Sequence, residues 1–332
     1  MIEFMHFTYL LNNEIGGIDF MISKIRKIIN NPYSIFSPLF YRGHLKWIPD
    51  KQALQLWYRS IFGKKLNLKD PKTFNEKLQW LKLYDRNNIY PTIVDKYTAK
   101  KYVSDIIGDE YLIKTLGVYD CFDEIDIEKL PNSFVIKCTH DSGGIVICTD
   151  KNKLDFTQAK NKIEKSLACN YYYEGREWPY KVIKPRVIVE EYMSNDDGKQ
   201  LMDYKFFCFN GHVKCLYVSE GSHTKNQKLQ FFDVTYSPMD CKRKDYLEYN
   251  KLPQKPLNFD LMINLAEKLS YGMPHVRVDL YEINNKVYFG EMTLYTCSGF
   301  IPFVDEKWDR IFGDYLDLLS TQIENVSKKV NY

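Results

Sequence analysis

The chain has 332 residues, of which 45% are hydrophobic and 27% are charged, and its formal net charge is +3 at pH 7. This length and apolar fraction are typical of a globular protein with one large domain or two domains. The nearly balanced charge gives no indication of nucleic-acid binding, which usually needs a strongly basic surface.

The cysteines indicate reduced thiols. Eight of them are scattered singly along the chain, without a Cys-x-x-Cys pair or a histidine at metal-ligand spacing. No run approaches the roughly 20 apolar residues that a membrane helix needs, and acids stand near the start where a signal peptide carries basic charge. We therefore expect a cytoplasmic protein.

Residues 1–60 are expected to form an N-terminal helical extension. The run that begins at Met21, a candidate second start, has the pattern of a basic amphipathic helix, and apolar side chains continue among Arg42 and Lys46. Residues 21–48 could lie on an anionic membrane surface, which would associate the protein with the inner face of the membrane. The alternative, packing on its own domain, is the one we favour.

Residues 61–110 are expected to form a second helical segment. Helical apolar spacing extends over residues 51–84, and Thr73 followed by Glu76 predicts a capping box. A further helix is predicted to begin near Asp95 and to end at Gly108. The first hundred residues are thus predicted to be mostly helical.

From about residue 111 the pattern changes to strands. Residues 134–138 and 145–148 are predicted strands, and the first carries Lys137, which is costly to bury unless it meets an anion. The loop between them, residues 139–144, ends in Gly143 and Gly144. Its backbone N–H groups could bind phosphate oxygens. An ordinary hairpin turn is the alternative.

Two further strands carry charged side chains. Residues 186–193 form a predicted strand that ends in Glu190 and Glu191, which could face adenine or simply be solvated. In the strand 203–209, alternation places Asp203 and Lys205 on one face, and the Asn210-Gly211 pair predicts a type I′ turn. Other predicted helices are 157–168, 258–271 and 306–326, and residues 221–256 are expected to be a mobile excursion.

A hairpin over residues 275–293 organises the rest of the prediction. If 284–286 are its loop, Ile283 faces Val287, and the register then places Asp279 opposite Glu291. Arg277 and Thr293 are opposed on the same face. A two-residue turn would instead make the two acids diagonal neighbours.

Opposed acids point to a cation. Like charges placed directly opposite destabilise a strand pair, so Asp279 and Glu291 favour a bound metal. Few, close oxygen ligands suit Mg²⁺, which shares its remaining positions with water and phosphates. A solvated strand face is the alternative.

These segments together resemble the TupA-like branch of the ATP-grasp superfamily, which is named for teichuronopeptide biosynthesis. The resemblance covers most of the chain after about residue 35. It rests on the order and spacing of these residues: 70–80, 95–97, 130–131 with 134–140, 190–192, 203–206, 277–279 and 290–291.

The resemblance implies an α+β fold in which two lobes with antiparallel sheets clamp the nucleotide. The small lobe with its glycine flap would span residues 111–187, and the large lobe with the adenine and metal sites would span residues 188–328. Both follow the helical extension and the helical segment described above.

The resemblance also implies a role for each matching residue. Phosphate contacts would come from Lys96, Lys137 and the covering loop with His140, Ser142, Gly143 and Gly144. Adenine would contact Glu190, Glu191 and the Met193 backbone, and Asp203 would bind the ribose. Lys205 and Arg277 would be the catalytic cations. Asp279, Glu291 and Thr293 would bind Mg²⁺, with Thr293 where many ATP-grasp proteins have Asn.

The implied activity is that of an ATP-dependent carboxylate–amine ligase that forms an amide through an acyl phosphate. Its partners would be ATP, Mg²⁺, a carboxylate-bearing sugar such as a uronic acid of a surface polysaccharide, and an amine or amino acid. A polysaccharide glycosyltransferase is the alternative, which the lack of an Asp-x-Asp triplet disfavours. A kinase is disfavoured because Gly143 and Gly144 follow Lys137, and a noncatalytic scaffold because the acids are present.

Overall fold

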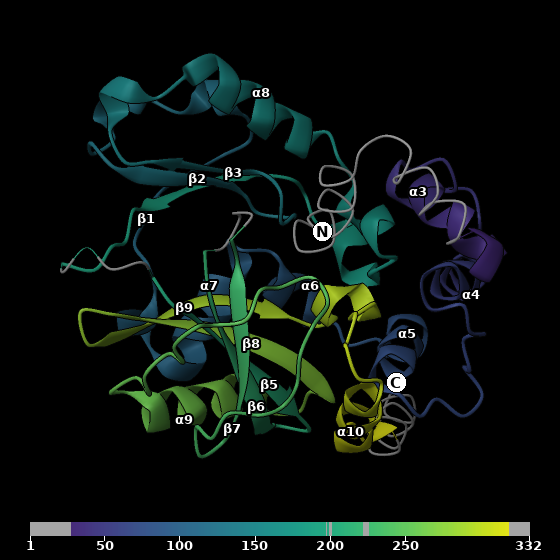
Figure 1. Cartoon of the computed structure of the whole chain (residues 1–332). Helices are drawn as coiled ribbons and strands as arrows, with labels where there is room; N and C mark the ends of the chain where they lie inside the picture. Colours follow the sequence, from purple (N-terminus) through teal and green to yellow (C-terminus); the bar gives the residue numbers. More distant parts are fainter. Residues whose placement is uncertain (1–27, 197, 199–200, 222–225, 319–332) are drawn as a thin grey trace, which may run out of the picture.

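Two antiparallel sheets face each other in the computed structural model, with helices on their outer sides (Figure 1). The structure describes residues 28–196, 198, 201–221 and 226–318. Residues 21–27, the first part of the predicted amphipathic helix, and the chain beyond residue 318 lie outside the described residues. Within these ranges, no helix is both long and apolar enough to cross a membrane.

The smaller sheet has four strands in the order β1 (Thr115–Tyr119), β4 (Val187–Glu191), β2 (Phe134–Cys138) and β3 (Ile145–Cys148). Helix α8 (Phe156–Leu167) covers its outer face (Figure 1). Ala159 and Ile163 of this helix share a buried apolar cluster with Phe134 and Val187 of the sheet. This packing leaves the other face of the sheet turned toward the larger sheet.

The larger sheet has five strands in the order β7 (Lys228–Asp233), β6 (His212–Glu220), β5 (Asp203–Phe209), β8 (His275–Ile283) and β9 (Lys286–Thr293). Helix α9 (Phe259–Ser270) packs against β5 and β8 through Met262, Leu265 and Leu269. The Asn210-Gly211 turn has positive φ at both residues, as predicted for type I′.

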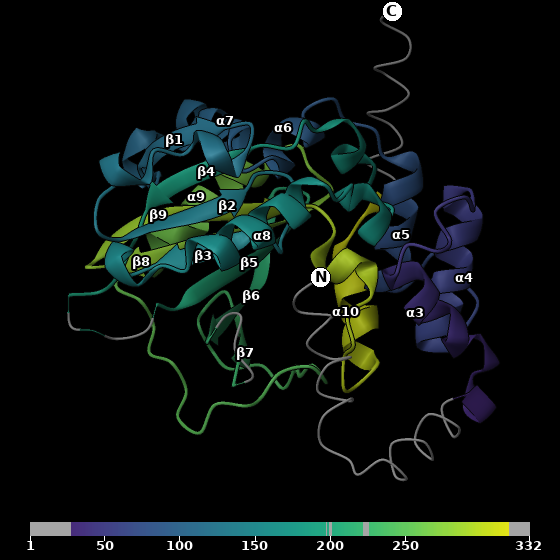
Figure 2. The ribbon, with the colours of Figure 1, turned by 90° about the horizontal axis from the view of Figure 1, so that it is seen from above.

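Four of the other helices lie together at one end of the molecule (Figure 2): α3 (Phe36–Tyr41), α4 (Asp50–Phe62), α5 (Phe74–Tyr84) and α10 (Lys307–Tyr315). Helices α6 (Tyr90–Val94) and α7 (Thr98–Ile107) pack on each other, α6 also contacts β9, and α7 contacts α9. Short 3-10 turns are η1 (Pro32–Ile35), η2 (Asp109–Tyr111), η3 (Phe122–Glu124), η4 (Ile127–Lys129), η5 (Lys151–Lys153), η6 (Tyr171–Glu174), η7 (Trp178–Val182) and η8 (Thr296–Gly299).

Local sequence signals explain several of these elements. Helix α5 begins at the predicted capping box, in which Thr73 accepts from the Glu76 N–H and Glu76 accepts from the Thr73 N–H. Phe40 of α3 stacks on the fully buried Trp57 at 4.7 Å between ring centroids. Trp57 in turn lies 5.2 Å from Phe300 between ring centroids, so the described part of the N-terminal segment packs on the rest of the domain, although Trp47 is 78% exposed.

Three expectations need correction. Residues 221–256 include strand β7, which pairs with β6, so this region is not simply an irregular excursion. The last described helix, α10, ends at Tyr315. Strand β4 pairs with β1 and β2, so a lobe boundary at 187/188 would cut the smaller sheet. The division between the sheets falls after Glu191.

All eight cysteines are free.

Candidate active site

The β8–β9 hairpin places the two predicted metal ligands opposite each other, but by a different route from the predicted one. The turn has two residues, Asn284 and Asn285, both with positive φ, and Ile283 pairs with Lys286. This frame alone would set Asp279 opposite Gly290. A bulge at Gly290 shifts the register, so Asp279 pairs with Glu291.

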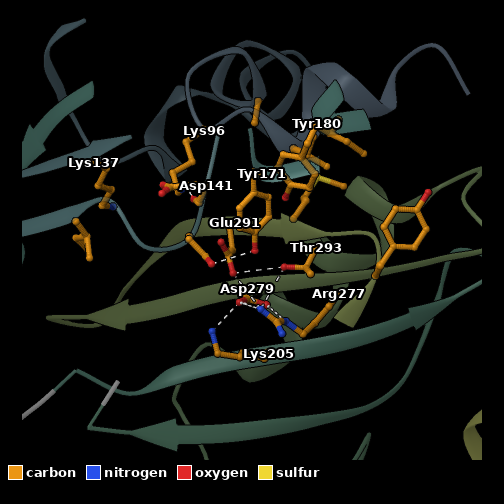
Figure 3. A pocket seen from close by; sticks show the side chains of 18 of the residues that line it. Lys96, Lys137, Asp141, Tyr171, Tyr180, Lys205, Arg277, Asp279, Glu291 and Thr293 are labelled. Atoms are coloured by element: carbon orange, nitrogen blue, oxygen red, sulfur yellow. Dashed lines mark hydrogen bonds and ion pairs between the residues drawn. The ribbon is translucent and has the colours of Figure 1, made fainter. Parts of the chain in front are cut away.

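Around this pair lies a compact network of charges (Figure 3). The guanidinium of Arg277 donates from Nε to Asp279 Oδ1 and from Nη2 to Asp279 Oδ2, both at 2.7 Å. Nη2 also lies 3.0 Å from Glu291 Oε1 and 3.2 Å from the Thr293 hydroxyl. From neighbouring β5, Lys205 Nζ donates to Asp279 Oδ2 at 2.6 Å. The hairpin and β5 thus bring the five side chains together.

The ionisation of this network follows from burial and its cations. Burial raises the pKa of Asp279 to about 6, against the opposing effect of Arg277 and Lys205. Burial also opposes ionisation of Glu291, but Arg277 and Lys205 lower its pKa to about 2. Although burial opposes its charge, Asp203 and Asp279 raise the pKa of Lys205 well above its usual value. At neutral pH both acids of the hairpin are therefore ionised.

The two acids differ in accessibility. The side chain of Asp279 is 1% exposed and its oxygens already accept from Arg277 and Lys205, whereas the side chain of Glu291 is 43% exposed. Carboxylate and hydroxyl oxygens are ligands that Mg²⁺ accepts. The donor set therefore fits Mg²⁺, with Glu291 and Thr293 on the open side. Among the described residues, no three acids, histidines or cysteines are grouped so that they could hold a metal ion by themselves. Water or phosphate oxygens would have to complete the coordination of Mg²⁺.

The glycine loop, residues 139–144, is held in place by hydrogen bonds to Asp141, an acid of the loop itself. Asp141 Oδ2 accepts from the Gly144 N–H at 2.9 Å and from the Ser166 hydroxyl, while Lys96 Nζ donates to the carbonyls of Cys138, at 3.1 Å, and Asp141. A Cβ on Gly144 would lie 2.4 Å from Ser166 Oγ, so only glycine fits there. Lys96 and Asp141 thus fix the loop over the cavity.

On the smaller sheet, Glu190 bridges two lysines. Its Oε2 accepts from Lys137 Nζ at 2.7 Å, and its Oε1 pairs with Lys100. Burial opposes the charge, but the two lysines lower the pKa of Glu190. The charge of Lys137, which is costly to bury in a strand, is therefore balanced by the carboxylate of Glu190.

These groups surround one cavity of about 260 Å³ between the sheets (Figure 3). Eleven of the residues predicted for the site line it: Lys96, Lys137, Ser142, Gly144, Glu190, Asp203, Lys205, Arg277, Asp279, Glu291 and Thr293. Of the described residues, four predicted ones lie outside its lining: His140, Gly143, Glu191 and Met193. The His140 ring hydrogen-bonds to the Cys169 carbonyl, 3.1 Å away, and serves packing.

Sequence reasoning did not identify several residues that line the cavity. Lys100 stands four residues after Lys96, so the helix predicted to begin near Asp95 would have placed the two lysines on one face, although Lys96 in fact precedes α7. Tyr171, Tyr180, Glu174 and Glu177 come from the irregular segment between α8 and β4. This segment has no periodicity from which their direction could be predicted.

Two antiparallel sheets that close on a cavity lined by a glycine loop and paired acids define an ATP-grasp protein, a class of ATP-dependent ligases. The chain belongs to the TupA-like ATPgrasp family, whose sequence profile matches residues 76–317. Comparison with curated proteins gives no match.

Solved ATP-grasp structures show distant similarity. D-alanine-D-alanine ligase from Helicobacter pylori has 16% identity and a TM-score of 0.39, over 74% of this chain and 69% of that one. The ATP complex of D-alanine-D-alanine ligase from Bacillus anthracis has 13% identity and a TM-score of 0.36, over 61% and 54%. The ligase PsnB with its minimal precursor has 9% identity and a TM-score of 0.37, over 76% and 68%. Similarity at this level supports no inference about substrates.

Proposed function

We propose that this protein is a Mg²⁺-dependent carboxylate–amine ligase that forms an amide through an acyl phosphate. Its substrates would be a uronic-acid carboxylate of a surface polysaccharide and the amino group of an amino acid or another amine. The observation that carries the proposal is the convergence of Asp279, Glu291, Arg277 and Lys205 with the Lys96-supported glycine loop on one cavity.

The proposed chemistry depends on charge placement. A carboxylate oxygen of the sugar attacks the γ-phosphorus of ATP, and the bond from that phosphorus to the bridging oxygen breaks to release ADP. The amine nitrogen, as the free base, then attacks the acyl carbon, phosphate leaves with the electron pair of the C–O bond, and the nitrogen loses a proton to water. An amine that binds as its ammonium cation first gives up one proton to water. Such transfer needs orientation and neutralised charge more than an activated nucleophile.

The cations of the hairpin would supply this neutralisation. Arg277 and Lys205 lie together on the large-sheet side of the cavity, where a transferring phosphoryl group would gain from both charges. Their pairing with Asp279 holds both side chains in place before substrates arrive. The network is therefore preorganised for an anion that approaches from the open side.

Glu291, Asp279 and Thr293 would hold the metal. Bound Mg²⁺ would neutralise phosphate oxygens and orient them. Glu291 is the ligand we expect to be reached first, because it is the exposed acid of the pair. Asp279 is positioned by Arg277 and Lys205, so its contact with the metal depends on sharing its oxygens with these cations.

The nucleotide would lie along the smaller sheet. Lys137 and Lys100 give this wall of the cavity two positive charges against the single charge of Glu190, which favours phosphate oxygens. The support for a uronic acid comes from the family resemblance, and the anion-binding charges are compatible with it.

The test is ADP release by the full chain with ATP, Mg²⁺, glucuronic or galacturonic acid, and each amino acid in turn. Mass spectrometry would identify the amide, and hydroxylamine in place of the amine would trap an acyl phosphate as the hydroxamate. Glu291→Gln should abolish ADP release, whereas Glu306→Gln, which makes the same charge change in an exposed pair with Lys64, should retain it. Nucleotide release from a sugar donor without ATP would contradict the proposal and support glycosyl transfer.

A further inference from the structure

The cavity also has an aromatic end, which adjoins the glycine loop where the Tyr171 hydroxyl hydrogen-bonds to the Ser142 hydroxyl at 3.0 Å. This aromatic end, as we call it, is lined by Tyr41, Trp57, Tyr171, Glu174, Glu177, Tyr180, Tyr295, Cys297, Ser298 and Phe300. Ring contacts connect its walls: Trp57 lies 5.2 Å from Phe300, and Tyr171 lies 4.7 Å from Tyr180 between centroids. Of these lining residues, two are acidic and none is basic.

An unusual backbone conformation builds one wall of the aromatic end. Cys297 and Ser298 have φ of 50° and 53°, a left-handed conformation that costs energy for residues other than glycine. The Ser298 hydroxyl donates to Glu177 Oε1. A Cβ on Gly175 would lie 1.9 Å from Ser298 Oγ, so glycine is required for this close approach. The strained turn thus positions the Glu177 carboxylate.

A buried lysine stabilises the same turn. Lys82, 1% exposed, donates to Gln79 Oε1 at 3.1 Å, to the Gly175 carbonyl at 2.6 Å and to the Ser298 carbonyl at 2.7 Å. These three bonds use all the donors of an ammonium group. Burial lowers the pKa of Lys82 to about 7 and raises the pKa of Glu177. Lys82 therefore supports the backbone of the turn, and its hydrogen bonds go to Gln79 and to two carbonyls, not to the Glu177 carboxylate.

The second acid of the aromatic end adds to this charge. Glu174 Oε2 is buried and has no hydrogen-bond partner among the described residues, and Glu174 Oε1 accepts only a long contact from Cys169 Sγ, at 3.7 Å. Buried carboxylate oxygens without donors are costly unless a ligand supplies them. The lining thus contains a buried acceptor, Glu174 Oε2, that an N–H donor of a ligand could satisfy.

We propose that the aromatic end binds the amine co-substrate as its ammonium cation, with Glu177 as the specificity-determining residue; this rests on the proposed ligase function. A cation gains from a carboxylate and from the faces of tyrosine rings. An anionic uronic acid would be repelled by Glu174 and Glu177 and attracted by Arg277 and Lys205. The two charged ends of the cavity would thus sort the amine from the carboxylate.

A matched pair of small probes tests this. Glycinamide carries an ammonium group at neutral pH, and glycolamide has a neutral hydroxyl in its place. Calorimetry with the full chain, with and without a nonhydrolysable ATP analogue and Mg²⁺, should give at least about tenfold tighter binding of glycinamide, since a hydrogen bond to a charged group contributes about 1.5 kcal/mol or more. Glu177→Gln should remove this preference and leave the affinity for the ATP analogue unchanged.

Two further variants separate recognition from folding. Glu174→Gln lies outside the Lys82 network and should lower the glycinamide preference by a smaller factor, and Glu306→Gln should leave it intact. Equal binding of both probes, binding of neither, or displacement by methyl glucoside would overturn the proposal. A chain that selects glycinamide but does not bind the ATP analogue would contradict the ligase function while retaining the ammonium site.

Discussion

Arg277 and Asp279, two residues apart on one strand, form a two-point ion pair in which Nε and Nη2 each lie 2.7 Å from a carboxylate oxygen. Both side chains are at least 96% buried, and Lys205 joins the same carboxylate from the neighbouring strand. Asp279 therefore has a structural role in addition to its proposed role at the metal.

This dual role predicts different behaviour of the two acids. Asp279→Asn leaves Arg277 and Lys205 buried with less negative charge, so we expect a loss of about 3 kcal/mol in the free energy of unfolding as well as loss of ATP turnover. Glu291→Gln removes the more exposed acid, so it should lose turnover and no more than about 1 kcal/mol of stability. Urea denaturation and ADP release measure both. Equal destabilisation by the two variants would contradict this assignment.

The bulge at Gly290 predicts a steric effect. A Cβ there would lie 2.8 Å from the Tyr281 ring and 3.1 Å from the Asp279 carbonyl, so Gly290→Ala should lower the free energy of unfolding by about 2 kcal/mol. ADP release should also fall, because Glu291 depends on the bulge for its register. Gly143→Ala is the matched control for stability: its nearest atom is Asp141 Oδ2 at 3.6 Å, and its stability should change by less than about 0.5 kcal/mol. Similar urea midpoints for both variants would argue against the bulge.

The loop of residues 139–144 should respond to nucleotide. If it covers the phosphates, its amide hydrogen exchange should slow when an ATP analogue and Mg²⁺ are added, because ordered N–H groups are protected. Helix α8, on the outer face of the same sheet, provides the reference and should exchange as before. Unchanged exchange in the loop with saturating analogue would leave it an ordinary hairpin turn.

His275 predicts a pH dependence of stability. Burial lowers its pKa to about 3, and its Nδ1 hydrogen-bonds to the Cys208 carbonyl at 2.8 Å. Below the usual histidine pKa of about 6.5, the unfolded chain therefore binds a proton that the folded chain does not. The free energy of unfolding then decreases as the pH is lowered, by up to about 1.4 kcal/mol per pH unit.

Urea denaturation from about pH 7 to about pH 5 measures this slope. His275→Phe, which suits the neighbouring rings of Phe74 and Phe209, should have a shallower slope than the unchanged chain. Because other titrating groups are common to both proteins, the difference isolates His275. Parallel pH profiles would contradict the assignment.

Most of the local structure, and the pairing of the two hairpin acids, could be predicted from residue spacing alone. The capping box at Thr73, the Asn210-Gly211 turn and the alternation in the strands depend on near neighbours, so they were predicted from spacing. The facing of Asp279 and Glu291 was also predicted, although from a three-residue turn, because the bulge at Gly290 compensated for the shorter turn that the structure has.

How the charges are shared depends on three-dimensional packing. That Arg277 and Lys205 hold Asp279, and that Lys100 joins Lys137 on Glu190, depends on side chains from separate strands and helices meeting in space. The aromatic end was the part of the cavity that the sequence predicted least. Its acids lie on an irregular segment and face a strained turn more than a hundred residues away, and contacts over such a separation are fixed by packing, which periodicity does not encode.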